Sequence, residues 1–367
     1  MRRNRRLHFL LQRRKTGQTF IHLRYASRRI TPRLDQDLQA PGLRLVANFE
    51  QQVVMKAGSK VQVRWQASQR QRRLVMVTAL LVLTALYLQW HHVIAMPGHV
   101  DALQSAPRSA PPANLPHYQA SIDAKVVSGI ADNLSGLAYN PETKTLFAVT
   151  NRPPQIAELS TDGRLLRLAP LLGADDTEGI AHIQGDWFAI ADERSNRIHW
   201  VQFGKGVTEV SLENSPYIQL GDIHIKNFAL EGLGWDAKRQ QLLAVTEKWP
   251  MQVLVMDAPL SKLKPGRVDM KVSTWEVPAV EDMPSTDLAA IEVDPRSGNL
   301  LLLGEEASVL YEYSRAGDLL SVMPLWADMA GLADRVPQPE GLAVDNSGNI
   351  YIVSEPNLFY KFERKRG

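Results

Sequence analysis

Three glutamate residues stand at equivalent places in a repeated phrase, and they are the strongest candidates for chemistry in this chain. Glu178, Glu231 and Glu340 each precede a glycine and then a branched aliphatic residue. Two further copies of the phrase begin with Ser135 and Ala289 instead. Carboxylate oxygens suit Ca²⁺ or Mg²⁺, whereas zinc prefers the cysteine and histidine ligands that are absent or scarce here. The phrase therefore predicts a divalent-cation site, with Ca²⁺ as the expected ion.

A second set of polar residues follows the second apolar segment of each repeat. The set consists of Asn151, Asp192, Glu193, Glu247, Glu305, Glu306 and Glu355. Trp249 lies in the same connection as Glu247 and is a candidate to line a ligand-binding surface. Asp287, two residues before Ala289, is expected to replace the missing phrase glutamate. We predict metal ligands among Glu178, Glu231, Asp287 and Glu340, and ligand contacts from Asn151, Asp192, Glu193, Glu247, Glu305, Glu355 and Trp249.

The spacing of the phrase predicts the elements that position these side chains. The central small residues of successive phrases are 43, 53, 58 and 51 positions apart, and short apolar segments separated by turns follow each one. A period near 50 with about four short β segments indicates an all-β fold, a β-propeller of four-stranded blades. Five blades result if residues 118–127 supply the last strand and close the ring. Further strands within 204–228 or 258–286 would instead give six blades.

In such a blade, the loop entering the first strand and the loop leaving the second strand open at the same end. We call this end of the propeller the mouth. Acidic residues from all five blades then meet there, and they repel one another unless a cation, a basic partner or raised pKa values relieve the repulsion. The alternative is structural: each phrase glutamate accepts hydrogen bonds from backbone N–H groups of the neighbouring blade and holds the ring together.

The charge is divided unevenly along the chain. Residues 1–73 carry 18 Lys or Arg against three acidic residues, whereas the remainder carries 24 basic and 36 acidic residues. A basic tail on an acidic body is one signature of nucleic-acid binding, but the uncharged run 74–88 follows the tail directly. With its extension to residue 96, this run approaches the roughly 20 residues needed to cross a bilayer. We therefore expect a membrane anchor at 74–96 and no nucleic-acid partner; a cleaved signal peptide is the alternative.

The arginines before the run predict the orientation of the anchor. Arg70, Arg72 and Arg73 favour a cytoplasmic N-terminus and an exported C-terminal body. Residues 97–116 contain five prolines and read as a semi-extended linker that reaches roughly 60 Å. We thus expect a single-pass protein of the bacterial inner membrane, with a monomeric periplasmic propeller at 117–367.

Several segments resemble the SdiA-regulated family of bacterial membrane-anchored propeller proteins. The segments are 348–357 with 359–362, 190–194, and the entry strand 118–130. The resemblance covers residues 118–362 and implies a short N-terminal segment, one membrane anchor and a periplasmic propeller. The long basic tail departs from that pattern.

Three classes of function follow from these features. The first is a divalent-cation-dependent binding module of the cell envelope, which recognises a small molecule or an envelope protein at the mouth. The second is a Ca²⁺-dependent hydrolase acting on an ester, lactone or phosphoester, although the chain has no nucleophile elbow, HExxH helix or phosphate-binding glycine loop. The third is a scaffold without a ligand.

We predict that residues 1–54 are either disordered or not translated, and in the second case Met55 is the true start. Residues 1–54 are rich in arginine, show no regular apolar period and are expected to lack a core, whereas Met55 lies 19 residues before the apolar run. If translation starts at Met55, mass spectrometry of the protein from its native host should find no peptides from residues 1–54. Peptides from that stretch would place the start upstream.

Overall fold

The computed structural model describes residues 8–13, 19–24, 69–90, 113–220, 230–247, 251–257, 260–275 and 285–365. Near the N-terminus, β1 (His8–Arg13) pairs antiparallel with β2 (Thr19–Arg24). A helix, α1 (Gln69–Trp90), follows. Among the described residues, no helix combines the length and the apolar character needed to cross a membrane.

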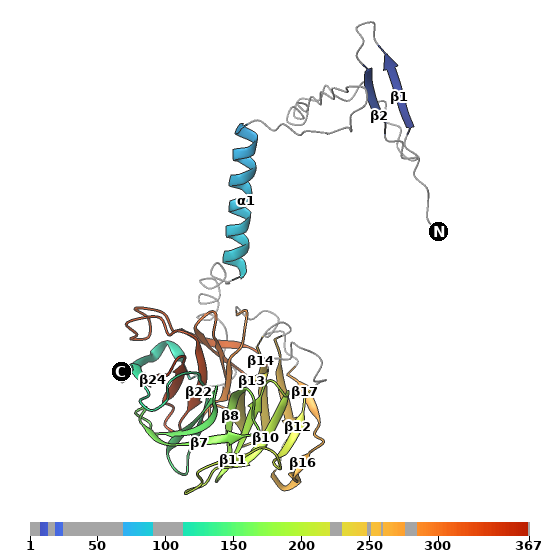
Figure 1. Ribbon diagram of the computed structural model, residues 1–367. Helices are drawn as coiled ribbons and strands as arrows, with labels where there is room; N and C mark the ends of the chain where they lie inside the picture. The colour runs from blue at the N-terminus through green and yellow to red at the C-terminus, as the bar shows by residue number, and fades with distance from the viewer. Residues whose placement is uncertain are drawn as a thin grey trace. The chain divides into compact units, whose positions relative to one another are not determined.

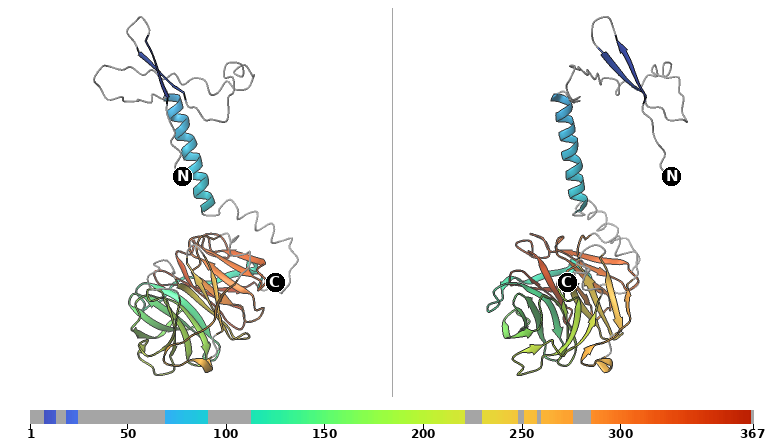
Figure 2. Two further views of the ribbon diagram at one scale, coloured as in Figure 1. Left: turned by 90° about the vertical axis from the view of Figure 1, so that its right-hand side faces the viewer. Right: turned by 45° about the vertical axis from the view of Figure 1, so that its right-hand side comes forward.

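The described part of residues 113–365 forms five sheets, and the prediction of an all-β propeller with five four-stranded blades is confirmed (Figures 1 and 2). Blade one consists of β4 (Leu134–Asn140), β5 (Thr145–Asn151), β6 (Pro154–Leu159) and β7 (Leu165–Leu172). Blade two consists of β8 (Thr177–Gln184), β9 (Trp187–Asp192), β10 (Arg197–Gln202) and β12 (Pro216–Gln219). Blade three consists of β13 (Leu230–Asp236), β14 (Gln241–Thr246), β15 (Val253–Asp257) and β17 (Val272–Thr274).

The remaining two blades follow the same antiparallel order. Blade four consists of β18 (Ala290–Val293), β19 (Leu300–Gly304), β20 (Val309–Tyr313) and β21 (Leu319–Pro324). Blade five consists of β22 (Pro339–Val344), β23 (Ile350–Ser354), β24 (Leu358–Arg364) and β3 (Tyr118–Val126), which comes from before blade one. The first strands contact one another in the order β4, β8, β13, β18 and β22, and β22 contacts β4.

Two short strands lie in the segments that left the blade count open. β11 (Val210–Ser211) pairs parallel with β7 of the preceding blade. β16 (Gly266–Arg267) pairs parallel with β12, again at the outer edge of the preceding blade. Within the described residues, both strands therefore extend existing sheets and form no sixth one.

Buried apolar residues pack between neighbouring blades, because each sheet is covered on both faces. In β5, Phe147 and Val149 join the cluster shared with blade two, while the alternate residues Leu146 and Ala148 join the cluster shared with blade five. The rings of Phe147 and Phe188 lie 4.5 Å apart between blades one and two. Two-sided burial explains why the second strands are wholly apolar in sequence rather than alternating.

The glycine of the repeated phrase is required by close approach of the first strands. A methyl group on Gly136 would lie 2.5 Å from the Glu178 carbonyl oxygen, and one on Gly232 would lie 2.7 Å from the Ala289 carbonyl oxygen. A methyl group on Gly179 would overlap the Glu231 carbonyl oxygen. The ladder between the first and second strands also shifts register at the phrase in blades one, two, three and five. Such bulges redirect the side chains beside them.

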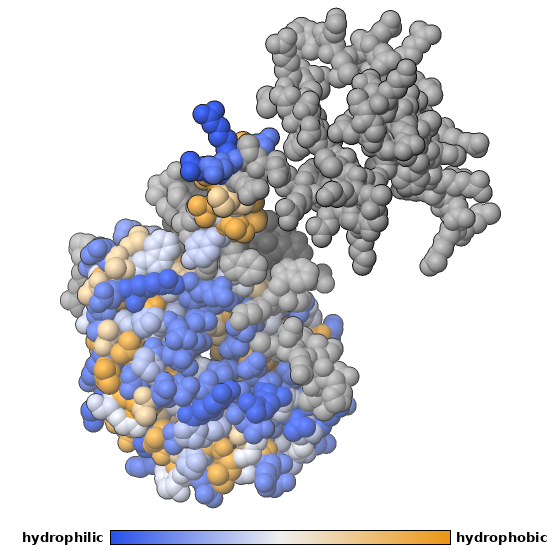
Figure 3. All heavy atoms as spheres, turned by 45° about the horizontal axis from the view of Figure 1, so that its top comes forward, coloured by the Kyte–Doolittle hydropathy of each residue, from blue (hydrophilic) through white to orange (hydrophobic). Residues whose placement is uncertain are grey.

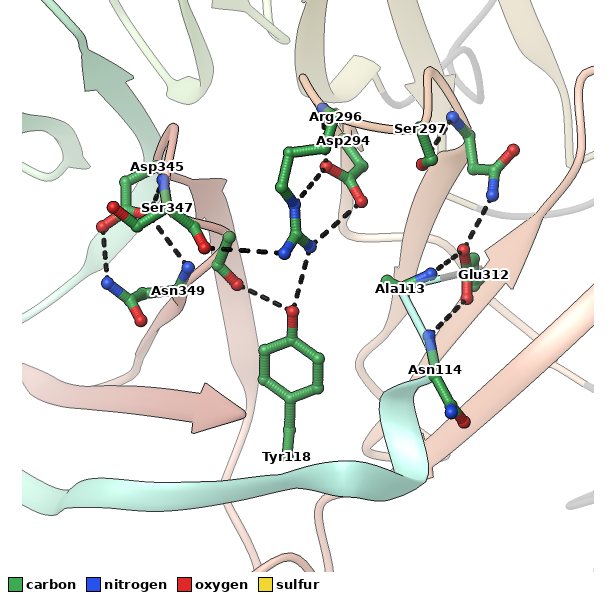
Figure 4. Close-up of polar contacts among 12 residues, drawn as sticks. Ala113, Asn114, Tyr118, Asp294, Arg296, Ser297, Glu312, Asp345, Ser347 and Asn349 are labelled. Atoms are coloured by element: carbon green, nitrogen blue, oxygen red, sulfur yellow. Dashed lines mark hydrogen bonds and ion pairs between the residues drawn. The ribbon is translucent and has the colours of Figure 1, made fainter. Parts of the chain in front are cut away.

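The chain enters the propeller at the end opposite the mouth. Glu312, fully buried on β20, accepts hydrogen bonds from the backbone N–H of Ala113 at 2.6 Å and of Asn114 at 3.3 Å (Figure 4). The hydroxyl of Tyr118 donates to the Gly348 carbonyl oxygen at 2.8 Å and accepts from Arg296 at 3.0 Å. Gly348 and Arg296 lie in the turns that join first to second strands, which are the turns at the far end of the blades. The entering segment therefore leaves the mouth uncovered.

We expect Gly179→Ala to destabilise the propeller by about 3 kcal/mol or more, because its new methyl group meets the backbone of the next blade, which cannot move alone. Urea denaturation measures the change. Gly206→Ala is the matched control: a methyl group there meets nothing within 4 Å, although φ is +83°. Its expected cost is about 1 kcal/mol. Equal losses in the two variants would contradict the packing explanation.

Candidate cation-binding site

The structure brings the beginnings of the first strands and the ends of the second strands to one end of each blade. Leu134 pairs with Thr150, Thr177 with Asp192, Leu230 with Thr246, Ala290 with Leu303, and Pro339 with Ser354. The phrase residues and the polar residues after the second strands therefore share the mouth. Figure 3 shows hydrophilic residues around a small opening on one face of the propeller.

Glu178 is held by side chains of the preceding blade. The hydroxyl of Ser135 donates to Glu178 Oε2 at 2.9 Å, and the amide nitrogen of Asn151 donates to Oε1 at 3.1 Å. Burial nevertheless raises the pKa of Glu178 to about 7, because the two hydrogen bonds only partly offset the loss of water. The structural alternative thus applies to Glu178 in a modified form: side chains, not backbone N–H groups, link it to blade one.

Glu231 is 9% exposed, and among the described residues no hydrogen-bond donor reaches its carboxylate. Burial raises its pKa well above the ordinary value, and repulsion from Glu178, Glu193, Glu340 and Glu247 raises it further. A buried carboxylate that faces four others and has no donor is costly to ionise. Ionised Glu231 therefore needs a positive charge nearby.

Glu340 repeats this situation in blade five. Burial raises its pKa to about 9, and repulsion from Glu305, Glu178 and Glu355 adds to the effect. No donor among the described residues reaches its side chain either. The three phrase glutamates thus lie close enough to disfavour one another's charge, as the repeat predicts. Glu355 lies beside Glu340, and burial raises its own pKa too.

Two of the predicted site residues are occupied by hydrogen bonds that link the loop before the first strand to the loop after the second strand of the same blade. Asp287 accepts from the backbone N–H of Glu305 at 3.0 Å and of Glu306 at 2.9 Å. Asp192 accepts from the Ser195 hydroxyl at 2.7 Å and from the backbone N–H of Asp176 at 3.1 Å. Both side chains are nearly fully buried. Each carboxylate fixes the loop after a second strand, which leaves it poorly placed for an outside ligand.

Asp176 is a mouth residue that the repeat did not identify. It precedes the blade-two phrase, and only the acidic pair Asp175-Asp176 ahead of Glu178 could have signalled it. Its Oδ2 is shared by the guanidinium groups of Arg152 at 3.0 Å and Arg194 at 3.5 Å. Its charge raises the pKa values of Glu178 and Glu193, although burial is the larger cause for both.

The remaining predicted residues divide by position. Glu193 and Glu247 interact electrostatically with Glu231, and Glu305 with Glu340. Trp249 lies outside the described residues. Within the described ranges, no three histidine, cysteine, aspartate or glutamate side chains are placed to hold one metal ion. In the described propeller, the carboxylates at the mouth repel one another.

Comparison with known proteins identifies a family for the propeller. A family model described as "SdiA-regulated" matches residues 112–363. Among solved structures, a luciferin-regenerating enzyme is 13% identical with a TM-score of 0.41, and the match covers 67% of this chain and 94% of that one. A gluconolactonase from Xanthomonas campestris is 14% identical with a TM-score of 0.39, covering 69% and 98%. Values at this level say nothing about the ligand or reaction of this chain.

In the absence of cations, we expect the stability of the propeller to fall as pH rises from about 4.3 to about 9. In that range folded Glu340, with its pKa of about 9, keeps a proton that an unfolded glutamate, with a pKa of about 4.3, has released. One such group contributes a slope of up to about 1.4 kcal/mol per pH unit. Urea denaturation in chelator across this range should therefore give a flatter profile for Glu340→Gln. An unchanged slope would disprove the assignment, and exposed Glu209→Gln serves as the control.

Proposed function

The chain belongs to the SdiA-regulated family, and from that premise we propose that its propeller is a cation-dependent binding module of the cell envelope. The mouth is the binding surface, and Ca²⁺ is the expected cation. The pairing of β3 with β24 supports the further proposal that the two ends of the propeller close its ring.

Glu231 carries the proposal. Its carboxylate is nine-tenths buried, receives no hydrogen bond from the described residues and lies among four other acidic side chains. A cation at the mouth would offset charges from three blades at once. Ca²⁺ takes six to eight oxygen ligands that include amide and backbone carbonyl oxygens and water. A few carboxylates, completed by amide oxygens, backbone carbonyl oxygens and water, would therefore be enough to bind Ca²⁺.

Anchoring to the inner membrane is proposed from the sequence of the segment around α1. Large apolar side chains between Leu74 and Tyr87 are exposed along the helix. The predicted span 74–96 continues past the last described helical residue, Trp90. With the arginine flank on its N-terminal side, this segment supports a cytoplasmic N-terminus and a periplasmic propeller.

The position of the entering segment supports a ligand from the periplasm. Ala113 and Asn114 are fixed to Glu312 at the end of the propeller opposite the mouth. These contacts hold residues 113 and 114 away from the mouth, which supports the proposal that the mouth binds a small molecule or a partner protein of the envelope.

We expect Ca²⁺ to raise the melting temperature of the chelator-treated propeller and Glu231→Gln to abolish most of that rise. At a Ca²⁺ concentration of 100 times Kd, binding adds about 2.7 kcal/mol to the free energy of unfolding. For a domain of this size that is roughly 5–10 °C. Thermal unfolding with Ca²⁺, Mg²⁺ and Zn²⁺ in separate titrations measures the shift, and Glu209→Gln is the control.

The same samples separate the competing functions. Turnover of chromogenic esters, lactones or phosphoesters that stops on adding chelator would replace the binding module by a hydrolase. No shift with any divalent ion would leave only a scaffold.

A further inference from the structure

We propose that the mouth carries a subsite between blades one and two that binds a carbohydrate, a neutral ligand with neighbouring hydroxyl groups. The subsite is formed by Asn151, Arg152, Asp176 and Arg194. The inference rests on the proposed binding role of the mouth and names its ligand class. Its starting point is two buried oxygen atoms beside Glu178.

Asn151 Oδ1 and Asp176 Oδ1 are both buried, and neither has a hydrogen-bond partner among the described residues. The Asn151 amide nitrogen is directed to Glu178, so the amide oxygen is the atom that remains. Asp176 is 7% exposed, and its other oxygen holds both arginines. A buried acceptor without a donor costs free energy, and such atoms in native proteins usually await a water, an ion or a ligand. Here Asn151 donates to Glu178, and Asp176 acts on Glu178 electrostatically, so both unpartnered oxygens belong to residues that interact with Glu178.

Arg152 and Arg194 supply hydrogen-bond donors at the same place. Each guanidinium carries five N–H groups, and the described contacts of each use one nitrogen, on Asp176 Oδ2. The side chains are 64% and 59% exposed, so they can turn outward and open a path to Asp176. The subsite therefore presents unused acceptors and unused donors side by side.

A hydroxyl group matches this combination because it donates one hydrogen bond and accepts others. Two neighbouring hydroxyls can donate to Asn151 Oδ1 and Asp176 Oδ1 while their oxygens accept from the arginines. An anionic group would contact the arginines but would face Glu178 and Glu193, whose charges already act on Arg152. An ammonium group would satisfy the acceptors but would lie against two guanidinium groups. A neutral polyol meets neither repulsion.

The test measures binding of glucose and of N-acetylglucosamine to the Ca²⁺-loaded full chain by calorimetry and by saturation-transfer NMR. Inorganic phosphate and putrescine are the anionic and cationic comparison probes. We expect at least one sugar to bind, and Arg152→Gln, Arg194→Gln and Asp176→Asn each to weaken it about tenfold, which is the loss of one charge-assisted hydrogen bond. Arg239→Gln is the matched control, since Arg239 is also a half-exposed arginine paired with a buried aspartate, Asp236, but at the far end of blade three.

The outcomes are distinct. Sugar binding that the two arginine variants weaken and Arg239→Gln leaves unchanged supports the subsite, even if Asp176→Asn fails to fold. No sugar binding, or equal binding by all variants, overturns it, as does arginine-dependent binding of phosphate or putrescine in place of sugar. The Ca²⁺-induced thermal shift, recorded on the same variants, reports on the proposed function separately. A normal thermal shift without sugar binding rejects the carbohydrate ligand and leaves the proposed cation binding intact. Loss of the thermal shift in Asp176→Asn would mean that the unpaired oxygen binds the metal, and this too would overturn the subsite.

Discussion

The close approach of five first strands around one axis is the constraint on which the rest of the propeller depends. At the repeated phrase, the backbone of one blade lies so near the next that a methyl group on Gly136 or Gly179 would collide with it. This contact leaves no room for side chains between the strands at that level. The residue before the glycine lies at the mouth end of its first strand, where the ladder to the second strand shifts register, and such bulges redirect the side chains beside them.

Placing glutamates at this crowded position has an electrostatic consequence. Their carboxylates lose water because neighbouring blades surround them, and they lie close enough to repel one another. Among the described residues, hydrogen bonds relieve only Glu178 of the three, through Ser135 and Asn151. A proton relieves Glu231 and Glu340, whose pKa values are raised, and the proposed cation would relieve them in the same way. The proposed cation would stabilise the ionised glutamates by offsetting their mutual repulsion. The crowding of the first strands and the proposed cation dependence are connected in this way.

The two ends of the propeller serve different purposes. At the far end, Glu312 and the Tyr118–Arg296 pair fix the entering chain with fully formed hydrogen bonds, and Glu312 also accepts from Asn299 and Ser321. At the mouth, the buried acceptors Asn151 Oδ1 and Asp176 Oδ1 lack partners among the described residues, as do the buried indole N–H groups of Trp200 and Trp235 elsewhere in the propeller. Buried polar groups normally find partners in native proteins. The two unpartnered acceptors at the mouth are the atoms on which the proposed ligand subsite rests.

The sequence by itself determined a propeller of four-stranded blades, because the repeated glycine phrase and the two-sided apolar strands report local packing at each blade. It left five or six blades open, and the structure decided for five because β11 and β16 extend existing sheets. The sequence also indicated that Glu178, Glu231 and Glu340 share one end, since antiparallel strands place equivalent residues together. Only the tertiary structure decided how each carboxylate is used. Asp192 and Asp287 each join the two mouth loops of their own blade, and Asp176 receives arginines from two blades. Such partners are brought together by contacts between residues distant in the chain, which no spacing in the sequence encodes.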